Sequence, residues 1–169
     1  MTIFGKQVSE YVAFQKGILW LIVIVALGRL GLSLAGVPNS TVKWLSVTAV
    51  ASLGLIYYAI RVHTTGFGSY KQLLPLLAIQ NFVAHVLIAA AIVLAIFTGR
   101  DNIYSAPEFS GGSDGKTWTH AGAHLLFGVV LFTLLSWLVA SGIMFITKKL
   151  TGGGQELPKG KDRATTAGA

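Results

Sequence analysis

Histidine is the residue type in this sequence with the widest chemical repertoire, and His85 has the most unusual setting. It lies in the middle of a long apolar stretch, with Gln80 and Asn81 before it at helical spacing. An imidazole at that depth could ligate the metal of a tetrapyrrole, bind a quinone or relay protons. The structural alternative is a histidine that hydrogen-bonds a neighbouring helix. We take His85, Asn81 and Gln80 as candidate cofactor-binding residues.

A second pair of histidines, His120 and His124, is spaced four residues apart at the start of a later apolar stretch. Helical spacing places both rings on one face, where they could bind a metal ion. A third ligand could come from Asp101, Glu108 or Asp114 in the preceding polar segment. No glutamate stands between the histidines, so the metalloprotease motif is absent. The alternative is that His120 lies in the headgroup region beside Trp118 while His124 packs against the preceding polar segment.

The depths of these histidines argue against one haem held by two of them. His85 lies about 12 residues from the outer end of its stretch and His124 about 6, which at 1.5 Å per residue is a mismatch of roughly 9 Å. His63 lies at the opposite boundary, with no histidine at its level. The sequence therefore predicts that His85 and His124 are separated, while a tetrapyrrole held by a single histidine stays open.

Four long apolar segments must position these side chains. The chain has 169 residues, 53% hydrophobic and 11% charged, with a mean hydropathy of +0.68. A membrane-spanning helix needs about 20 apolar residues. We predict an all-α integral membrane protein, a four-transmembrane-helix bundle within residues 17–150, whose spans are about 17–34, 44–62, 73–97 and 118–146.

Two flanking segments complete the predicted organisation. Residues 1–16 have a weak amphipathic pattern, which indicates an interfacial lead or a helical extension of the first span. Residues 151–169 are rich in glycine and lysine and are expected to form a disordered cytoplasmic tail.

The distribution of basic residues predicts the orientation. Nine lie on one side of the spans and four on the other, so both termini are expected in the cytoplasm and residues 98–117 outside. The nine are Lys6, Lys16, Arg61, Lys71, Lys148, Lys149, Lys159, Lys161 and Arg163; the four are Arg29, Lys43, Arg100 and Lys116. Since these charges flank apolar spans, the expected partner is the lipid bilayer of a bacterial inner membrane and not nucleic acid.

The outer segment, residues 98–117, is longer than most connections and mixes charged with aromatic residues. It could dock onto an extrinsic domain, fold over the helix ends or form an ordinary solvated connection.

The absence of certain residues narrows the function. The sequence has no cysteine, which excludes thiolate metal sites, iron–sulfur clusters and covalently attached haem. The predicted spans contain no aspartate or glutamate, which disfavours a proton-coupled transporter. Our main interpretation is a small, non-catalytic accessory subunit of a larger membrane complex of energy conversion or electron transfer, with other membrane subunits as partners.

Two other interpretations stay open. One is a membrane redox protein that holds haem, chlorophyll or a quinone through His85. The other is an outer-face metal-binding membrane protein that uses His120 and His124.

Overall fold

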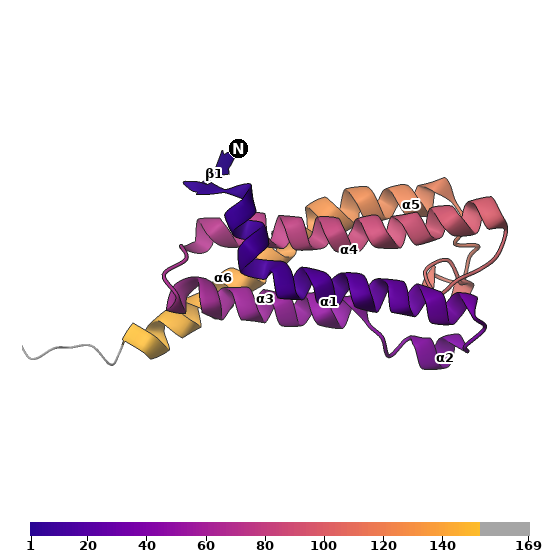
Figure 1. Cartoon of the computed structure of the whole chain (residues 1–169), viewed down its shortest axis with the longest axis horizontal. Helices are drawn as coiled ribbons and strands as arrows, with labels where there is room; N and C mark the ends of the chain where they lie inside the picture. Colours follow the sequence, from indigo (N-terminus) through magenta and orange to yellow (C-terminus); the bar gives the residue numbers. More distant parts are fainter. Residues whose placement is uncertain (153–169) are drawn as a thin grey trace, which may run out of the picture.

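The structure, a computed structural model that describes residues 1–152, is an all-helical bundle. Its four long helical segments run side by side along the long axis of the molecule (Figure 1). Each segment is long and apolar enough to cross a membrane. The predicted all-α architecture with four membrane-length segments is confirmed.

The elements follow the chain in a simple order. A short hairpin of β1 (Thr2–Ile3) and β2 (Lys6–Gln7) precedes the helices. The helical elements are α1 (Val8–Leu34), α2 (Asn39–Val42), α3 (Val47–Thr64), α4 (Tyr70–Thr98), the 3₁₀ turn η1 (Pro107–Phe109), α5 (Trp118–Ala123), the π-helical η2 (His124–Leu131) and α6 (Phe132–Gly152).

The helices extend beyond the predicted spans at several ends. α1 already begins at Val8, so residues 8–16 continue the first span as one helix, and only residues 2–7 form a separate hairpin. The last segment continues to Gly152. Residues 153–169, most of the predicted tail, lie outside the described part of the chain.

Local sequence explains where the helices begin and end. Ser69 and Gln72 form a capping box at the start of α4, where the Ser69 amide donates to Gln72 Oε1 at 2.7 Å. Ser46 Oγ accepts the Ala49 amide at the start of α3. Gly99, with φ of 69°, ends α4 in the left-handed conformation that glycine adopts without strain.

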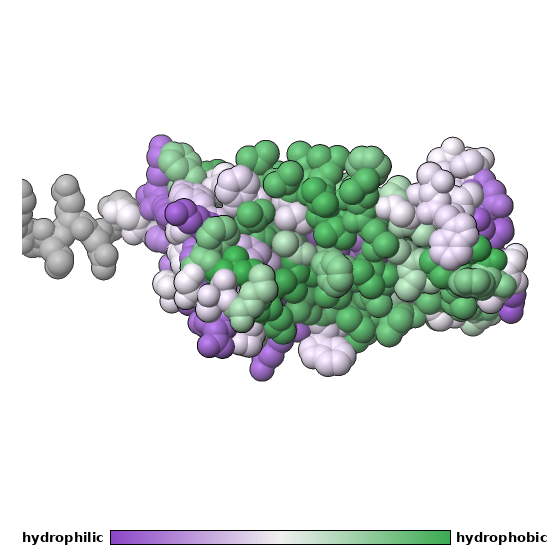
Figure 2. All heavy atoms as spheres, turned by 90° about the horizontal axis from the view of Figure 1, so that it is seen from above, coloured by the Kyte–Doolittle hydropathy of each residue, from purple (hydrophilic) through white to green (hydrophobic). Residues whose placement is uncertain are grey.

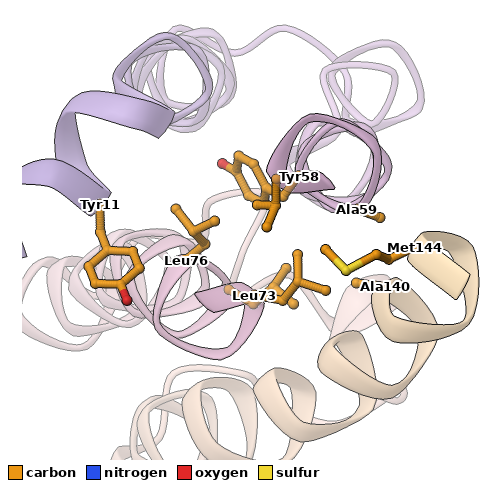
Figure 3. Close-up of a cluster of buried hydrophobic side chains, with 9 residues drawn as sticks. Tyr11, Tyr58, Ala59, Leu73, Leu76, Ala140 and Met144 are labelled. Atoms are coloured by element: carbon orange, nitrogen blue, oxygen red, sulfur yellow. The ribbon is translucent and has the colours of Figure 1, made fainter. Parts of the chain in front are cut away.

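The two ends of the bundle differ. The N-terminus and Gly152 lie at one end, which we call the terminal end, while α2 and the 99–117 segment lie at the other, the distal end (Figure 1). An apolar cluster that joins α1, α3, α4 and α6 fills the terminal end (Figure 3). Its fully buried members include Tyr11, Tyr58, Leu73, Leu76 and Met144.

The surface between the two ends is largely apolar. In Figure 2 hydrophobic residues cover the middle of the molecule, and hydrophilic residues gather toward its ends. Large side chains such as Trp20, Ile24 and Leu53 are more than half exposed there. This pattern is typical of a helix bundle whose sides face lipid.

The 99–117 segment folds into the distal end of the bundle. Asn102, Ile103 and Ser105 are buried, and the Asn102 amide group donates to the carbonyl of Ala91 at 2.8 Å. Tyr104 Oη donates to the carbonyl of Ala26 at 3.1 Å. Of the three possibilities for this segment, the structure shows folding over the helix ends.

Candidate functional site

A cavity of about 490 Å³ lies between α3, α4 and the segment formed by α5, η2 and α6. We call it the histidine pocket. Its polar lining comprises Thr48, Ser52, Gln80, Asn81, His85, His120, His124 and Ser136; its apolar lining comprises Val47, Ala51, Leu55, Ala84, Ile88, Ala123, Phe127, Gly128 and Phe132. Three of the four histidines of the chain therefore meet in one cavity.

His85 and His124 are in direct contact across this pocket. Their Nδ1 atoms are 3.0 Å apart, and the ring centroids are 5.3 Å apart with planes 30° from parallel. The ring of Phe132 packs on His85 with a centroid distance of 5.7 Å. The prediction that a difference in depth separates His85 from His124 is wrong.

The distal segment is the physical reason for that error. After α4 ends at Thr98, the chain turns back along the bundle. The Asn102 amide group then donates to the carbonyl of Ala91, which lies inside α4, well before its C-terminal end. α5 then starts beside the body of α4, where Trp118 shares a shallow groove with Val93. Counting residues from the two outer ends assumed that both helices end at the same level. They do not, and the offset brings His124 level with His85.

Gly128 makes room for the His85 ring. A Cβ at this position would overlap the Nδ1, Cγ and Cε1 atoms of His85, so only glycine admits the ring as it is placed. Gly128 lies in η2, a π-helical segment that begins at His124. π-Helical turns are uncommon within α-helices and frequently occur at functional sites. The backbone of η2, on the His124 side of the contact, is thus shaped around the His85 ring.

His120 extends the pair toward the distal end. Its ring centroid lies 5.1 Å from that of His124, and its Nδ1 donates to the carbonyl of Gly115 at 2.9 Å. The Thr117 side chain caps α5 by accepting the His120 amide. Because a carbonyl can only accept, Nδ1 of His120 carries the proton and Nε2 of the neutral ring keeps a lone pair.

The His85–His124 contact also determines what the pair offers to a ligand. Between two neutral rings, one Nδ1 must donate and the other must accept. The donating ring then keeps a lone pair on Nε2, and the accepting ring carries a proton on its Nε2. The pair therefore has one hydrogen-bond donor and one acceptor at its outer nitrogens, and a proton can move between the rings along the contact.

Gln80 and Asn81, the other candidates on α4, each bind a neighbouring helix. Gln80 Nε2 donates to the carbonyl of Ala51 on α3 at 3.1 Å, and Asn81 Nδ2 donates to Thr133 Oγ1 on α6 at 3.1 Å. Both side chains are buried and line the pocket. They hold α3 and α6 at fixed positions around it.

The acidic residues proposed as metal ligands lie elsewhere. Asp101 accepts from Lys116 Nζ at 2.7 Å, and Glu108 accepts from Asn39 Nδ2 at 2.7 Å. The hydrogen bonds to Asp101 and Asp114 raise the pKa of Lys116. Within residues 1–152 no group of three or more histidine or acidic side chains is arranged to hold a metal ion. His120 and His124 are brought together, but Asp101 and Glu108 do not join them.

Sequence reasoning missed several pocket residues. Thr48 and Ser52 of α3 and Ser136 of α6 contribute hydroxyl groups, and Gly128 provides space. A signal for two of them was present in the sequence, because Thr48 and Ser52 are hydroxyl residues four apart inside an apolar stretch and hence share a helix face.

The arrangement limits how a tetrapyrrole could be held. A macrocycle ligated by both His85 and His124 would have to lie between rings that here hydrogen-bond directly. A tetrapyrrole ligated by only one histidine nitrogen, on the cavity side, would be compatible with this arrangement. No family model, no curated protein and no solved structure matches this chain.

Proposed function

We propose that this chain is an integral membrane protein that binds a quinone-type ligand in the histidine pocket and exchanges protons with it. The single observation that carries the proposal is the His85–His124 contact inside a cavity lined by further polar groups. Such a pair has one donor and one acceptor, which matches both oxidation states of a quinone. A quinone carbonyl accepts a hydrogen bond, and a quinol hydroxyl donates one.

The shape and lining of the pocket support a ligand that arrives from lipid. The cavity is partly open to the side of the bundle, and Phe127 and Phe132 at its wall are more than half exposed. Small-molecule sites combine mostly apolar walls with a few placed polar groups, over volumes of roughly 300–1,000 Å³. A polar ring with an apolar tail fits that description, with the ring at the histidines and the tail in the bilayer.

The proposed topology places both termini in the cytoplasm of a bacterial cell, on the basis of the nine-to-four distribution of basic residues. The distal end then faces outward. In this orientation His85, His124 and His120 follow one another within the pocket toward its outer side, with successive ring centroids 5.3 and 5.1 Å apart. If a redox centre of a partner protein takes the two electrons of a bound quinol, the two protons released would leave toward that side.

Titration of the purified protein in detergent micelles with ubiquinone-1, followed by quenching of tryptophan fluorescence, tests the proposal. We expect saturable binding that His85→Leu and His124→Leu each weaken by about tenfold or more, because a lost hydrogen bond to a buried ligand costs on the order of 1–2 kcal/mol. His63→Leu is the matched control, since His63 contacts Thr151 at the terminal end, outside the pocket.

Two results would reject the quinone proposal. One is the absence of saturable binding to the wild-type protein. The other is equal affinity in the wild type and both pocket variants. A Soret or chlorophyll absorption band that disappears in His85→Leu would instead support a tetrapyrrole on a single histidine.

A second candidate, also a proposal, is a subunit role within a larger membrane complex of energy conversion. The exposure of α1 favours this role. Only 11% of its most apolar 18-residue stretch is buried, the lowest share among the four long segments. Gly28 and Gly31 of α1 have open space around their Cβ positions, so no other helix of residues 1–152 approaches them. The mass of the assembly after mild detergent extraction from native membranes tests this role, and a mass of one chain would reject it.

A further inference from the structure

Five residues have buried polar side-chain atoms without a hydrogen-bond partner among residues 1–152. Two of them, Arg29 and Ser141, are only partly buried as residues. The other three lie on three different helices, and their atoms are both amide atoms of Gln15 on α1, the hydroxyl of Tyr58 on α3 and Oε1 of Gln80 on α4. Each of these residues is at most 1% exposed. Buried polar groups in folded proteins almost always have a partner, and where no protein group supplies it an internal water molecule does.

Contacts around Gly54 place the three groups within neighbouring helical turns. A Cβ on Gly54 would overlap Gln80 Oε1 and the side chain of Ile18, so Gln80 points its oxygen to the junction of α1, α3 and α4. Gln15 lies one turn before Ile18 on α1, and Tyr58 lies one turn after Gly54 on α3. The three residues therefore lie on neighbouring helical turns at one junction between α1, α3 and α4, with Gln15 and Tyr58 on the terminal side of the Gly54 contact.

Tyr11 provides a contrast within the same end of the bundle. It is as completely buried as Tyr58, but its hydroxyl donates to the carbonyl of Ile3 at 2.9 Å. In Figure 3 the Tyr58 oxygen is turned away from Met144 and Ala140, toward the side on which Tyr11 and α1 lie. The apolar cluster therefore packs around the Tyr58 ring, while its hydroxyl points to the α1 side of the cluster.

We propose that this junction binds a cluster of internal water molecules held by Gln15, Tyr58 and Gln80. The cluster satisfies the unpartnered atoms of all three side chains. Gln80 also lines the histidine pocket, so the water cluster adjoins the pocket on the side opposite His120. It gives the pocket a second proton connection, directed toward the terminal end. That connection rests on the proposed function, whereas the water site itself does not.

Hydroxyl-radical footprinting by X-ray radiolysis of the intact protein in nanodiscs tests the water site, because radicals form from bound water and modify the side chains next to it. No added ligand is required, so the result is independent of quinone binding. We expect Tyr58 to be modified at a rate similar to that of the partly exposed Tyr57, and Tyr11 to be protected. Equal protection of Tyr58 and Tyr11 would overturn the proposal.

A pair of tyrosine variants gives an independent readout. If Tyr58 binds water, Tyr58→Phe removes a hydrogen bond and raises the unfolding equilibrium constant about fivefold, as Tyr11→Phe does at its carbonyl partner. If the Tyr58 hydroxyl were dry and unpartnered, its removal would leave that constant unchanged or lower it. This second outcome, with Tyr11→Phe behaving as expected, would also overturn the proposal.

Discussion

Replacing Gly128 by alanine tests whether the bundle is built around the His85 ring. The new Cβ would overlap three ring atoms of His85, and one of them is Cγ, through which the ring is attached. A rotation of the ring about its own bond cannot clear that atom, so the whole side chain or η2 must move. The contact of His85 with His124 would then be lost.

The expected cost combines three terms. Forcing a methyl group into a packed site costs about 1–3 kcal/mol, and the lost hydrogen bond costs about 1 kcal/mol. The change from glycine to alanine in a helix returns up to about 1 kcal/mol. We therefore expect Gly128→Ala to lower the free energy of unfolding by about 1–3 kcal/mol. Gly142→Ala is the matched control: its Cβ has open space, so the variant should be more stable by about 0.5–1 kcal/mol.

The assay is reversible unfolding in mixed micelles by a denaturing detergent, followed by far-ultraviolet circular dichroism. A double-mutant cycle with His85→Ala makes the test specific, because Gly128→Ala should lose its cost once the ring is absent. If Gly128→Ala proves as stable as Gly142→Ala, or if its cost is the same with and without His85, the reasoning is refuted.

Three further predictions concern the distal end and the topology. Tyr104→Phe should lower the free energy of unfolding by about 1 kcal/mol because it removes the hydrogen bond to the Ala26 carbonyl. Burial raises the pKa of Tyr104 to about 12, so the contribution of this hydrogen bond should persist to about pH 10 and disappear as the pH rises toward 12. Measurement of the unfolding free energy as a function of pH checks both expectations. The Asn39 amide lowers the pKa of Glu108, so this contact should be lost only as the pH falls below the ordinary glutamate value of 4.5, and Asn39→Ala should raise that pKa in a carboxyl NMR titration. Because the chain has no cysteine, a single introduced cysteine reports the topology without background labelling. An impermeant maleimide should label Ser113→Cys in intact cells and Thr65→Cys only after permeabilisation. The reverse labelling pattern would invert the proposed orientation.

The helical architecture could be predicted from the sequence because each segment carries its own signal. Membrane-length apolar runs bounded by capping and turn residues, such as Ser69 and Gly99, specify a helix locally. The apolar pattern does not show where a helix continues into polar surroundings, so the sequence alone does not distinguish an interfacial lead from the helical extension that begins at Val8.

The site could be predicted only in part because its geometry depends on contacts distant in sequence. Residue type and setting alone identify His85, His120 and His124 as candidates. Their meeting depends on how the 99–117 segment packs, through the hydrogen bond from Asn102 to Ala91 and the close approach of Gly115 to the Ser105 backbone. Neither contact leaves a periodic signal in the sequence, so the relative depths of α4 and α5 could not be derived from counting.

The helical glycines of residues 1–152 indicate which side chains the bundle accommodates. Among those glycines, only Gly54 and Gly128 lie where a Cβ would meet another residue within 4 Å, and the residues met are Gln80 and His85, with Ile18 beside the first. Helical glycine costs up to about 1 kcal/mol relative to alanine, but at these two positions an alanine would make a close contact with a neighbouring side chain. In both cases that contact is a polar side chain of α4 that lines the histidine pocket. Gly54 and Gly128 therefore mark the two places where α3 and η2 make room for the polar face of α4, the face that lines the histidine pocket.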